Sequence, residues 1–223
     1  PVLSWLIALG KCRYCKNTIS YRYLLIELLT ALFFVFCLFS NPTDLSNSNQ
    51  LLIVIYGWIL VSINITLAYI DIDKFWLPSK ISNSGIIIGI IIYIFQFVEY
   101  KNQENFIVLI NHLLSSLLIF ISLRTFSYIS KRLLKKEILG LGDANLMAMA
   151  AAWLGSAGLE IVIILSILSA GLYSTICIIG KFLKKGSYIP LGAFIAPSIL
   201  LVWILGNDFW IVRLGNLLWW RYI

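Results

Sequence analysis

The sequence predicts an all-α protein, a polytopic bundle of transmembrane helices. Hydrophobic residues make up 61% of the 223 residues and charged residues only 12%, which leaves more apolar surface than a soluble domain can bury. The mean hydropathy is correspondingly high, at +0.93. The apolar residues also gather in runs close to the ~20 residues that cross a hydrocarbon core. These three observations together define the expected fold class.

About seven spans are expected, and most are separated by short polar breaks. Their ranges are 22–40, 51–70, 82–99, 106–124, 141–156, 158–180 and 189–206. The fifth is the shortest, begins among glycines, and is separated from the sixth by a tight turn. We therefore expect a transmembrane domain over 22–206, after an N-terminal stretch, 1–21, that carries one Cys-x-x-Cys pair. The Trp-rich tail, 207–223, suits an interfacial anchor.

The basic residues alternate between the loops. Fourteen of the 17 Lys and Arg residues lie in the N-terminal stretch and in the loops after the second, fourth and sixth segments, and only three lie elsewhere. Because basic residues near helix ends mark the cytoplasmic side, this asymmetry predicts an inside N-terminus and an outside C-terminus. The net charge of +7 would also suit nucleic acid. The placement of the basic residues in alternate loops favours membrane lipid as the partner and predicts no nucleic-acid partner.

Two aspartates stand at segment ends on that same side. Asp71 follows the second segment in "AYIDIDKFWLPSK", and Asp143 opens the fifth after Gly140 and Gly142 in "LGLGDANL". An ionised carboxylate near hydrocarbon is costly, so each needs a partner, water or a proton. The glycines permit close backbone approach. Two carboxylates held close can serve as acid and base on a water, which predicts amide hydrolysis without a metal.

A simpler interpretation of these aspartates also exists. Asp143 alone would suit a helix N-cap, and Asp71 alone would suit a surface charge at a helix end. The joint placement of the two carboxylates on one side, with the glycines beside Asp143, favours the catalytic interpretation.

Four stretches in order resemble the type IV prepilin peptidases, the leader peptidase/N-methyltransferases of pilus assembly and type II secretion. They are "GKCRYCKNTISYRYLLIELLTA" within 1–32, "IDIDKFWLPSK" at 70–80, "GLGDANLMAMAAAWLG" at 140–155 and "IPLGAFIAP" at 189–197. This family belongs to the GxGD group of intramembrane aspartic peptidases. The resemblance implies that Asp71, followed after five residues by Leu77 and Pro78, and Asp143 of GxGD are catalytic.

The resemblance also implies a substrate and a location. These are prepilins or pseudopilins, cleaved just after a glycine beside the cytoplasmic leaflet of a bacterial inner membrane, with no cofactor for the peptidase reaction. Gly140 and Gly142 would support the site. Asp73 is interpreted as a solvated neighbour, with a supporting role as the alternative. Glu27 is expected either to line the site or to pair with a basic residue such as Arg22.

Three positions depart from the pattern of the family. Ser79 stands where the family usually has Asp or Asn, Asn145 where it usually has Lys, and Leu24 where it usually has Pro. None of them removes a catalytic carboxylate, so we expect them to tune substrate choice. The single histidine, His112, is expected to bond between helices rather than to act in catalysis.

Cys12 and Cys15 form one Cys-x-x-Cys pair. Structural zinc takes four ligands, and the resemblance implies a cytoplasmic domain with two such pairs, of which 1–21 would be the remnant. The two thiols are therefore half of a zinc site if residues before Pro1 supply the rest, and otherwise a free dithiol. Methyltransferase activity with S-adenosylmethionine is implied by the resemblance alone, because the sequence shows no glycine-rich nucleotide-binding fingerprint.

Two other functions compete with a peptidase. A proton-coupled carrier also uses carboxylates within the membrane, but it needs ionisable groups across the midplane, and both aspartates lie near one face. A catalytically inactive homologue that only binds pilins would not need to retain both aspartates.

Overall fold

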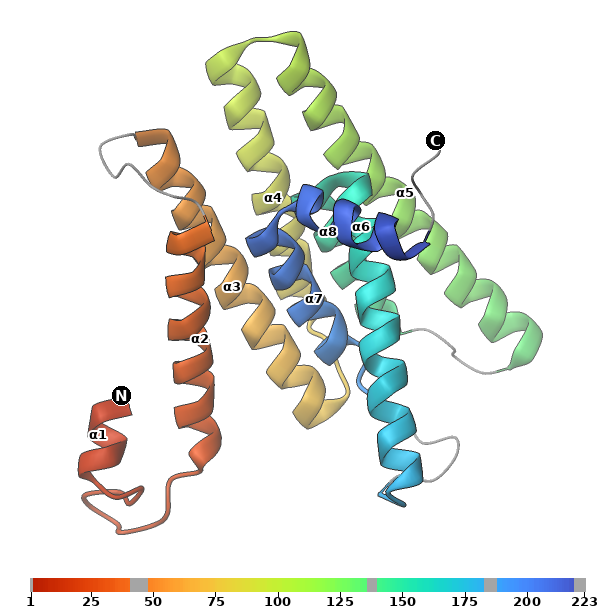
Figure 1. Ribbon diagram of the computed structural model, residues 1–223. Coiled ribbons are helices and arrows are strands. Elements are labelled where there is room, and N and C mark those ends of the chain that lie inside the picture. Colours follow the sequence, from red (N-terminus) through yellow and green to blue (C-terminus); the bar gives the residue numbers. More distant parts are fainter. Residues whose placement is uncertain (1, 41–47, 136–139, 183–187, 219–223) are drawn as a thin grey trace. The chain divides into compact units, whose positions relative to one another are not determined.

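The computed structural model describes residues 2–40, 48–135, 140–182 and 188–218. Within these ranges every named element is an α-helix (Figure 1), which confirms the all-α class. The chain divides into two compact units, Pro1–Ile65 and Thr66–Ile223. Parts of the expected loops, 41–47, 136–139 and 183–187, and the end of the tail, 219–223, lie outside the described residues.

The first unit contains α1 (Val2–Ile7), α2 (Tyr21–Ser40) and the beginning of α3 (Ser48–Lys74). The loop after α1 turns at Gly10, whose φ of +69° favours glycine, and a Cβ there would stand 2.9 Å from the Trp5 ring. Trp5 Nε1 donates to the Ile19 carbonyl at 3.3 Å, which closes the loop. Trp58 of α3 donates through Nε1 to the Phe34 carbonyl of α2 at 3.2 Å.

The second unit contains the end of α3, then α4 (Ser79–Tyr100), α5 (Gln103–Leu134), α6 (Leu141–Ile179), α7 (Gly192–Leu205) and α8 (Asn207–Leu218). Helix α4 ends at Lys101, which has left-handed backbone angles. Asn102 then caps α5, because its Oδ1 accepts from the Asn105 N–H at 2.9 Å. This short connection folds α4 and α5 into an antiparallel pair, joined at one end and diverging toward the other (Figure 1).

Five helices are long and apolar enough to cross a membrane, and α7 is a shorter apolar helix. The five ranges are Tyr21–Phe39, Leu51–Lys74, Ser79–Tyr100, Gln103–Leu133 and Leu141–Ile179. The seven expected segments therefore fall on six of the described helices. The fifth and sixth segments belong to one element, α6, and the seventh forms a helix of only 14 residues, about 21 Å long.

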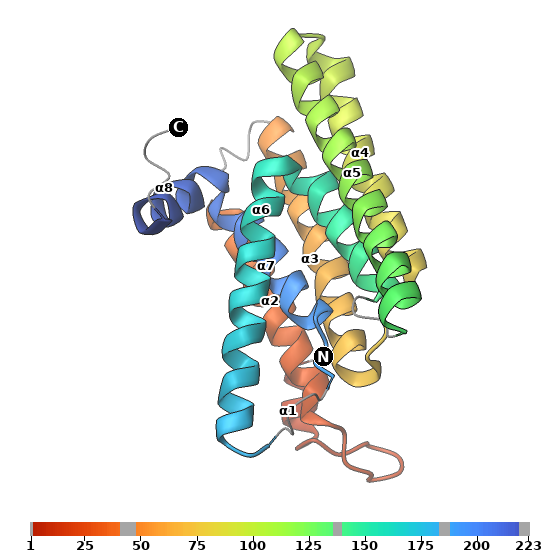
Figure 2. The same ribbon diagram turned by 90° about the vertical axis from the view of Figure 1, so that its right-hand side faces the viewer.

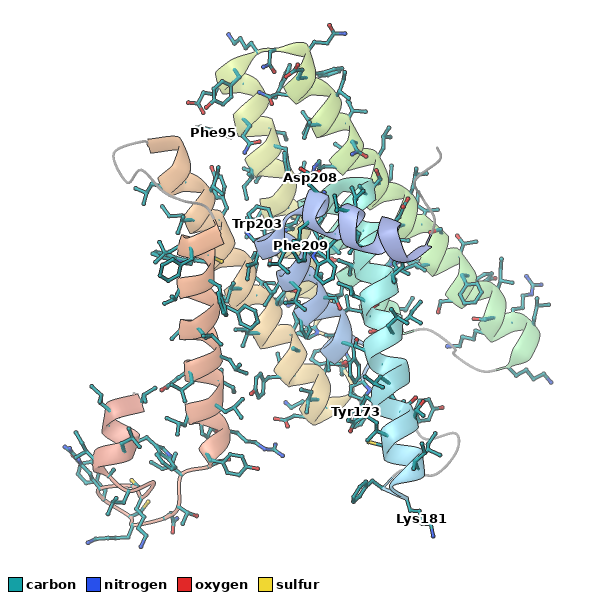
Figure 3. All side chains as sticks on the ribbon, viewed as in Figure 1. Phe95, Tyr173, Lys181, Trp203, Asp208 and Phe209 are labelled. Atoms are coloured by element: carbon teal, nitrogen blue, oxygen red, sulfur yellow. The ribbon has the colours of Figure 1, made fainter. Side chains whose placement is uncertain are left out.

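Helix α6 reverses direction at Gly155, where the tight turn between the fifth and sixth segments was expected. Gly155 has a φ of 69° and a ψ of −170°, which is not helical. Before it, the Trp153 ring lies 5.7 Å from Trp203 near the end of α7. After it, the Tyr173 ring lies 5.4 Å from Phe194 near the start of α7. Tyr173 and Trp203 are labelled at opposite ends of α7 in Figure 3.

The first half of α6 forms the core of the second unit, and every residue from Ala144 to Gly155 is buried. Ser116 Oγ of α5 donates to the Ala148 carbonyl at 2.8 Å. Trp153 Nε1 donates to the Gly85 carbonyl of α4, also at 2.8 Å. The alanines let neighbouring backbones approach closely. Because protein surrounds this half-helix, it need not match the thickness of the hydrocarbon core; Figure 2 shows it alongside α5.

The interhelical role expected for His112 is confirmed. Its Nδ1 lies 3.1 Å from the Ala152 carbonyl of α6, and its ring lies 3.7 Å from that of Tyr93 of α4. The Tyr93 hydroxyl in turn donates to the Trp153 carbonyl at 2.8 Å. His112 therefore joins three helices in the core.

Candidate active site

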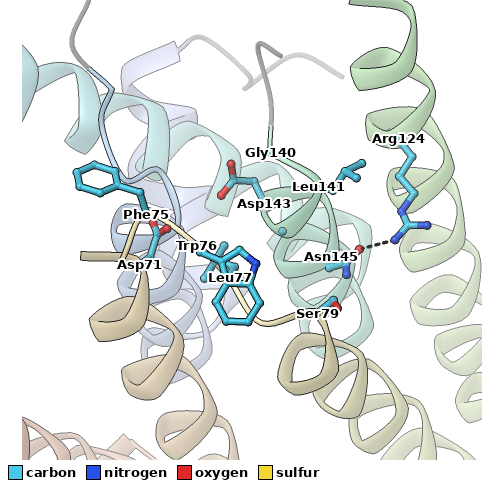
Figure 4. Close-up of a pocket in the computed structure, with 11 residues that line it drawn as sticks. Asp71, Phe75, Trp76, Leu77, Ser79, Arg124, Gly140, Leu141, Asp143 and Asn145 are labelled. Atoms are coloured by element: carbon cyan, nitrogen blue, oxygen red, sulfur yellow. Dashed lines mark hydrogen bonds between the residues drawn. The ribbon is translucent and has the colours of Figure 1, made fainter. Parts of the chain in front are cut away.

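A cavity of about 470 Å³ lies among the end of α3, the connection to α4, α5 and the start of α6 (Figure 4). All of these elements belong to the second unit. The lining residues are Asp71, Phe75, Trp76, Leu77, Ser79, Arg124, Gly140, Leu141, Gly142, Asp143 and Asn145. Two carboxylates that are 72 positions apart in the sequence therefore share one cavity.

Asp71 lies in the last turn of α3 and is only 4% exposed. Its Oδ2 accepts a hydrogen bond from the backbone N–H of Ala193 at 3.1 Å. Ala193 is in the first turn of α7, where backbone N–H groups and the helix dipole favour a negative charge. The preceding residue, Gly192, leaves room for this contact, because a Cβ there would stand 2.8 Å from Asp71 Oδ2.

Asp143 lies in the first turn of α6 and is half-buried. Its Oδ2 is 3.0 Å from the position of a Cβ on Gly140, so the carboxyl group folds back over the backbone that precedes the helix. The Asp143 carboxylate points toward the side of the cavity where Asp71 lies (Figure 4), and the two groups interact electrostatically. The structure thus brings the two predicted residues together, and their catalytic role stays a prediction.

Gly142 lies against the connection between α3 and α4. A Cβ on Gly142 would stand 2.7 Å from Leu77 Cβ and 3.3 Å from the Leu77 carbonyl oxygen. Leu77 itself is 5% exposed. The Leu77 backbone and Cβ cannot move aside as the end of a flexible side chain could. Gly142 therefore lets the turn before Asp143 approach the connection that follows Asp71.

Arg124 of α5 is a cavity residue that the sequence analysis used only for topology. Its Nη2 donates to Asn145 Oδ1 at 3.3 Å, and its guanidinium lies 4.2 Å from the centre of the Phe120 ring. The sequence did contain a signal, because Arg124 closes an apolar segment well before the basic run that begins at Lys131. The structure therefore adds one cation to the cavity of the two carboxylates.

The remaining predicted residues are distributed as follows. Asp73 is exposed and lies outside the cavity lining described above. Ser79 and Asn145, two of the departures from the family pattern, line the cavity. Glu27 belongs to the first unit, where it borders a separate cavity of about 170 Å³ that is also lined by Leu24. The alternatives for Glu27 stay open.

The two cysteines lie in the loop between α1 and α2. Cys12 N–H donates to the Asn17 carbonyl at 2.9 Å, and Lys16 N–H donates to the Cys12 carbonyl at 3.1 Å. Hydrogen bonds from the backbone of Cys15 and then Tyr14 lower the pKa of the Cys12 thiol, which favours the thiolate that binds metals. Among the described residues, no group of three or more His, Cys, Asp or Glu side chains could hold a metal ion. Structural zinc takes four ligands, so a zinc site that used these two thiols would need two more.

The fold and the cavity define a polytopic helical membrane protein with two carboxylates at its helix ends. Residues 58–175 match the type IV leader peptidase family, and residues 1–41 match the bacterial peptidase A24 N-terminal domain. The chain therefore belongs to the type IV leader peptidase family. No solved structure shows significant similarity to it.

Three relatives illustrate the similarity. The prepilin leader peptidase/N-methyltransferase of Dichelobacter nodosus is 31% identical over 206 residues, which cover 92% of this chain and 65% of that protein. The protein of the same name from Neisseria gonorrhoeae is 30% identical over 220 residues, 99% of this chain and 69% of that protein. The type 4 prepilin-like proteins leader peptide-processing enzyme of Escherichia coli O78:H11 is 30% identical over 176 residues, 79% of this chain and 60% of that protein. The chain thus spans about two thirds of the length of these curated relatives.

Proposed function

We propose that this chain is an aspartic endopeptidase that removes the leader from type IV prepilin-like substrates. The observation that carries the proposal is the shared cavity of Asp71 and Asp143. Membership of the leader peptidase family and the substrates named in its relatives support the same reaction. Neither a metal nor a covalent intermediate is required, because two carboxylates of unlike protonation can supply a base and an acid.

In the proposed reaction Asp71 is the base. The N–H of Ala193 and the start of α7 stabilise its ionised form. Asp71 takes a proton from a water molecule, whose oxygen adds to the carbonyl carbon of the scissile peptide bond. Asp143 is the acid, and it donates a proton to the leaving nitrogen as the carbon–nitrogen bond breaks. The products are a carboxylic acid on the leader and a free amine on the mature chain.

Arg124 is suited to a supporting part in this chemistry. Addition of water places negative charge on the former carbonyl oxygen, and a cation near that oxygen stabilises it. Arg124 has five N–H donors, and the contact with Asn145 orients one of its terminal nitrogens. Asn145 and Ser79 are also placed to contact the substrate, which supports the expectation that these two departures tune substrate choice.

We place the cavity at the cytoplasmic face of a bacterial inner membrane, with the N-terminus inside and the C-terminus outside. The asymmetry of the basic residues supports this orientation. With the turn at Gly155, the two halves of α6 run in opposite directions, so the path of the chain agrees with seven membrane segments of unequal length. The short first half of α6 is enclosed by protein.

We also propose that Cys12 and Cys15 are two ligands of a structural zinc site in the whole protein, whose other ligands lie outside this chain. Zinc would tie the loop after α1 to that further segment. Metal analysis of the whole protein should find zinc that is lost in Cys12→Ser and Cys15→Ser and retained in Cys177→Ser. N-methylation of the new amine, named in the relatives, belongs to the same whole-protein proposal and would use S-adenosylmethionine.

The rival functions have less support. A carrier needs a relay of ionisable groups across the membrane, whereas the two cavity aspartates lie at helix ends and His112 bonds to the Ala152 carbonyl. An inactive homologue that only binds pilins would leave the arrangement of the two carboxylates unexplained.

The test is direct. The protein purified in detergent is incubated with a prepilin that carries its leader, and mass spectrometry measures the mass of the products. Cleavage just after a glycine at the end of the leader supports the proposal. An intact substrate, with a folded enzyme confirmed by its thermal transition, would exclude peptidase activity.

A further inference from the structure

A second, apolar hollow of about 390 Å³ lies between α4 and α5. Both helices and the first half of α6 line it, and we call it the α4–α5 groove. Its apolar lining includes Ile86, Ile87 and Ile90 of α4 and Leu113, Leu117 and Phe120 of α5. Ile87 is 58% exposed and Leu117 is 50% exposed. In helices that cross a membrane such side chains contact either lipid or an apolar partner, and a hollow between two helices has room for either.

The groove continues from the cavity of the two carboxylates by one helical turn on each of three helices. On α4 the cavity residue Ser79 is followed four positions later by the groove residue Asn83. On α5 the cavity residue Arg124 stands four positions after the groove residue Phe120, and the two side chains are in contact. Residues four apart lie on the same helix face.

The third helix shows the same continuation. On α6 the cavity residue Asn145 is followed three positions later by Ala148, which forms part of the groove. Three residues of helix advance the lining by about 4.5 Å. In each helix the groove lies farther from the cavity end and deeper in the apolar segment. The apolar groove therefore begins about one helical turn from the polar cavity on all three helices.

Hydrogen bonds to α6 fix both sides of the groove. Ser116 Oγ of α5 donates to the Ala148 carbonyl at 2.8 Å, and Trp153 Nε1 donates to the Gly85 carbonyl of α4 at 2.8 Å. The groove is thus a preformed feature of the fold, and binding there requires little rearrangement of the helices.

We propose that the α4–α5 groove binds the apolar segment of the substrate that follows the scissile peptide bond on the membrane side. This inference rests on the proposed peptidase function and adds the part of the substrate that is recognised. A bond cleaved at a membrane surface has one flank in water and one in hydrocarbon, and the hydrocarbon flank must be apolar. The groove leads from the reacting carboxylates in that direction, whereas a lipid acyl chain has no reason to enter the polar cavity.

Photo-crosslinking tests where the substrate lies. Leu117→benzoylphenylalanine places a reactive group in the groove, and Leu118→benzoylphenylalanine places it on the adjacent residue, which is 65% exposed and outside the groove lining. Both are made with Asp143→Asn, so that the prepilin is not consumed. We expect an adduct with the prepilin at residue 117 that is at least 10-fold more abundant than at 118.

Kinetics provide the second measurement. Leu117→Trp fills the groove and should raise KM for an intact prepilin by about 10- to 100-fold, the loss expected when one large apolar side chain cannot bind. The kcat should change little. For a peptide cut back to the leader and the residues beside the scissile bond, KM should be the same as in wild type. Leu118→Trp should leave both substrates unaffected.

The outcomes separate the two proposals. If wild type does not cleave the prepilin, the proposed function fails and the groove proposal fails with it. If wild type cleaves but residue 117 yields only lipid adducts, or no more prepilin adduct than residue 118, the groove proposal alone is overturned. A rise in KM of equal size for the shortened peptide would also overturn it, because the effect would then arise in the cavity.

Discussion

Gly192 and Asp71 are in such close contact that a Cβ on residue 192 would stand 2.8 Å from the Asp71 carboxylate oxygen Oδ2. The two residues are 121 positions apart, in the start of α7 and the end of α3. The same approach lets the next residue, Ala193, donate its N–H to Asp71. The position of one candidate catalytic carboxylate therefore depends on the absence of a side chain on another helix.

Gly192→Ala should lower the rate of leader cleavage by about 10²-fold, because displacement of a catalytic group by roughly 1 Å costs that much. The added Cβ would stand 2.8 Å from both Asp71 Oδ2 and Leu77 Cδ1, so the Asp71 carboxylate must move. Gly171→Ala is the matched control, because a Cβ there meets nothing within 4 Å. Initial rates measured by mass spectrometry test the prediction, and equal rates for the two variants would contradict it.

Asp71→Asn and Asp143→Asn should each reduce cleavage by about 10²- to 10⁴-fold, the usual contribution of a general acid or base. The cleavage rate of the double variant should be only slightly lower than that of either single variant. Two residues that act in the same step are each needed, so removal of the second has little further effect. Asp73→Asn, at an exposed position in the same turn of α3, should keep most of the activity. Wild-type cleavage by Asp143→Asn would show that the two-carboxylate mechanism is wrong.

The sequence predicted the positions of the helices and of the two aspartates, because these depend on residues close together in the chain. Helices α2, α3 and α4 extend no more than four residues beyond the predicted apolar segments, because apolar runs of that length are themselves the signal. The tight turn predicted between the fifth and sixth segments lies within two residues of the observed turn at Gly155. Asp71 and Asp143 could be placed on one side because the alternation of basic residues gives the topology.

The remaining features depend on tertiary contacts that leave no periodic signal. Nothing in the sequence around Gly192 indicates that α7 donates a hydrogen bond to Asp71. The sequence sets Arg124 apart from the basic run that begins at Lys131, but only the contact with Asn145 shows that its side chain lies at the cavity. Hydropathy does not distinguish a half-helix enclosed by protein, such as 141–154, from one that faces lipid, so the sequence did not show that the fifth segment is a core element.

Trp153→Phe should lower the stability of the helical core and leave the chemistry largely intact. The change removes the Nε1 hydrogen bond to the Gly85 carbonyl, a loss of about 1 kcal/mol. For a chain of this size this amounts to a decrease in Tm of about 2–4 °C. Trp153 is 1% exposed, so water cannot replace the bond. Thermal unfolding in detergent measures the effect, and an unchanged Tm would show that the contact does not hold α4 to α6.

Single cysteines placed in a chain without its native ones test the orientation. Substitutions at the exposed residues Leu133 and Phe182 should be labelled by a membrane-impermeant maleimide only after the membrane is opened, and one at Phe209 should be labelled in intact cells. The reason is the 14-to-3 distribution of basic residues. Labelling of position 209 only after opening would put the C-terminus in the cytoplasm and reject the proposed path.

Gly142→Val should abolish leader cleavage with only a moderate loss of stability. The added Cβ would stand 2.7 Å from Leu77 Cβ and 3.3 Å from the Leu77 carbonyl oxygen, so either the Asp143 turn or the connection after α3 must move. Because Asp71 lies on one of these elements and Asp143 on the other, the movement separates the two carboxylates from the water they must share. A displacement of about 1 Å is enough for a loss on the order of 10²-fold.

The stability of the fold depends less on this contact than catalysis does. Gly142 lies at the mouth of α6, outside the continuously buried stretch from Ala144 to Gly155. Ala151→Val is the matched control, since Ala151 is 0% exposed and overpacking there should cost about 1–3 kcal/mol without touching the cavity. Cleavage rates and thermal unfolding are measured on both variants. Normal cleavage by a folded Gly142→Val would show that close approach at residue 142 does not set the distance between the carboxylates.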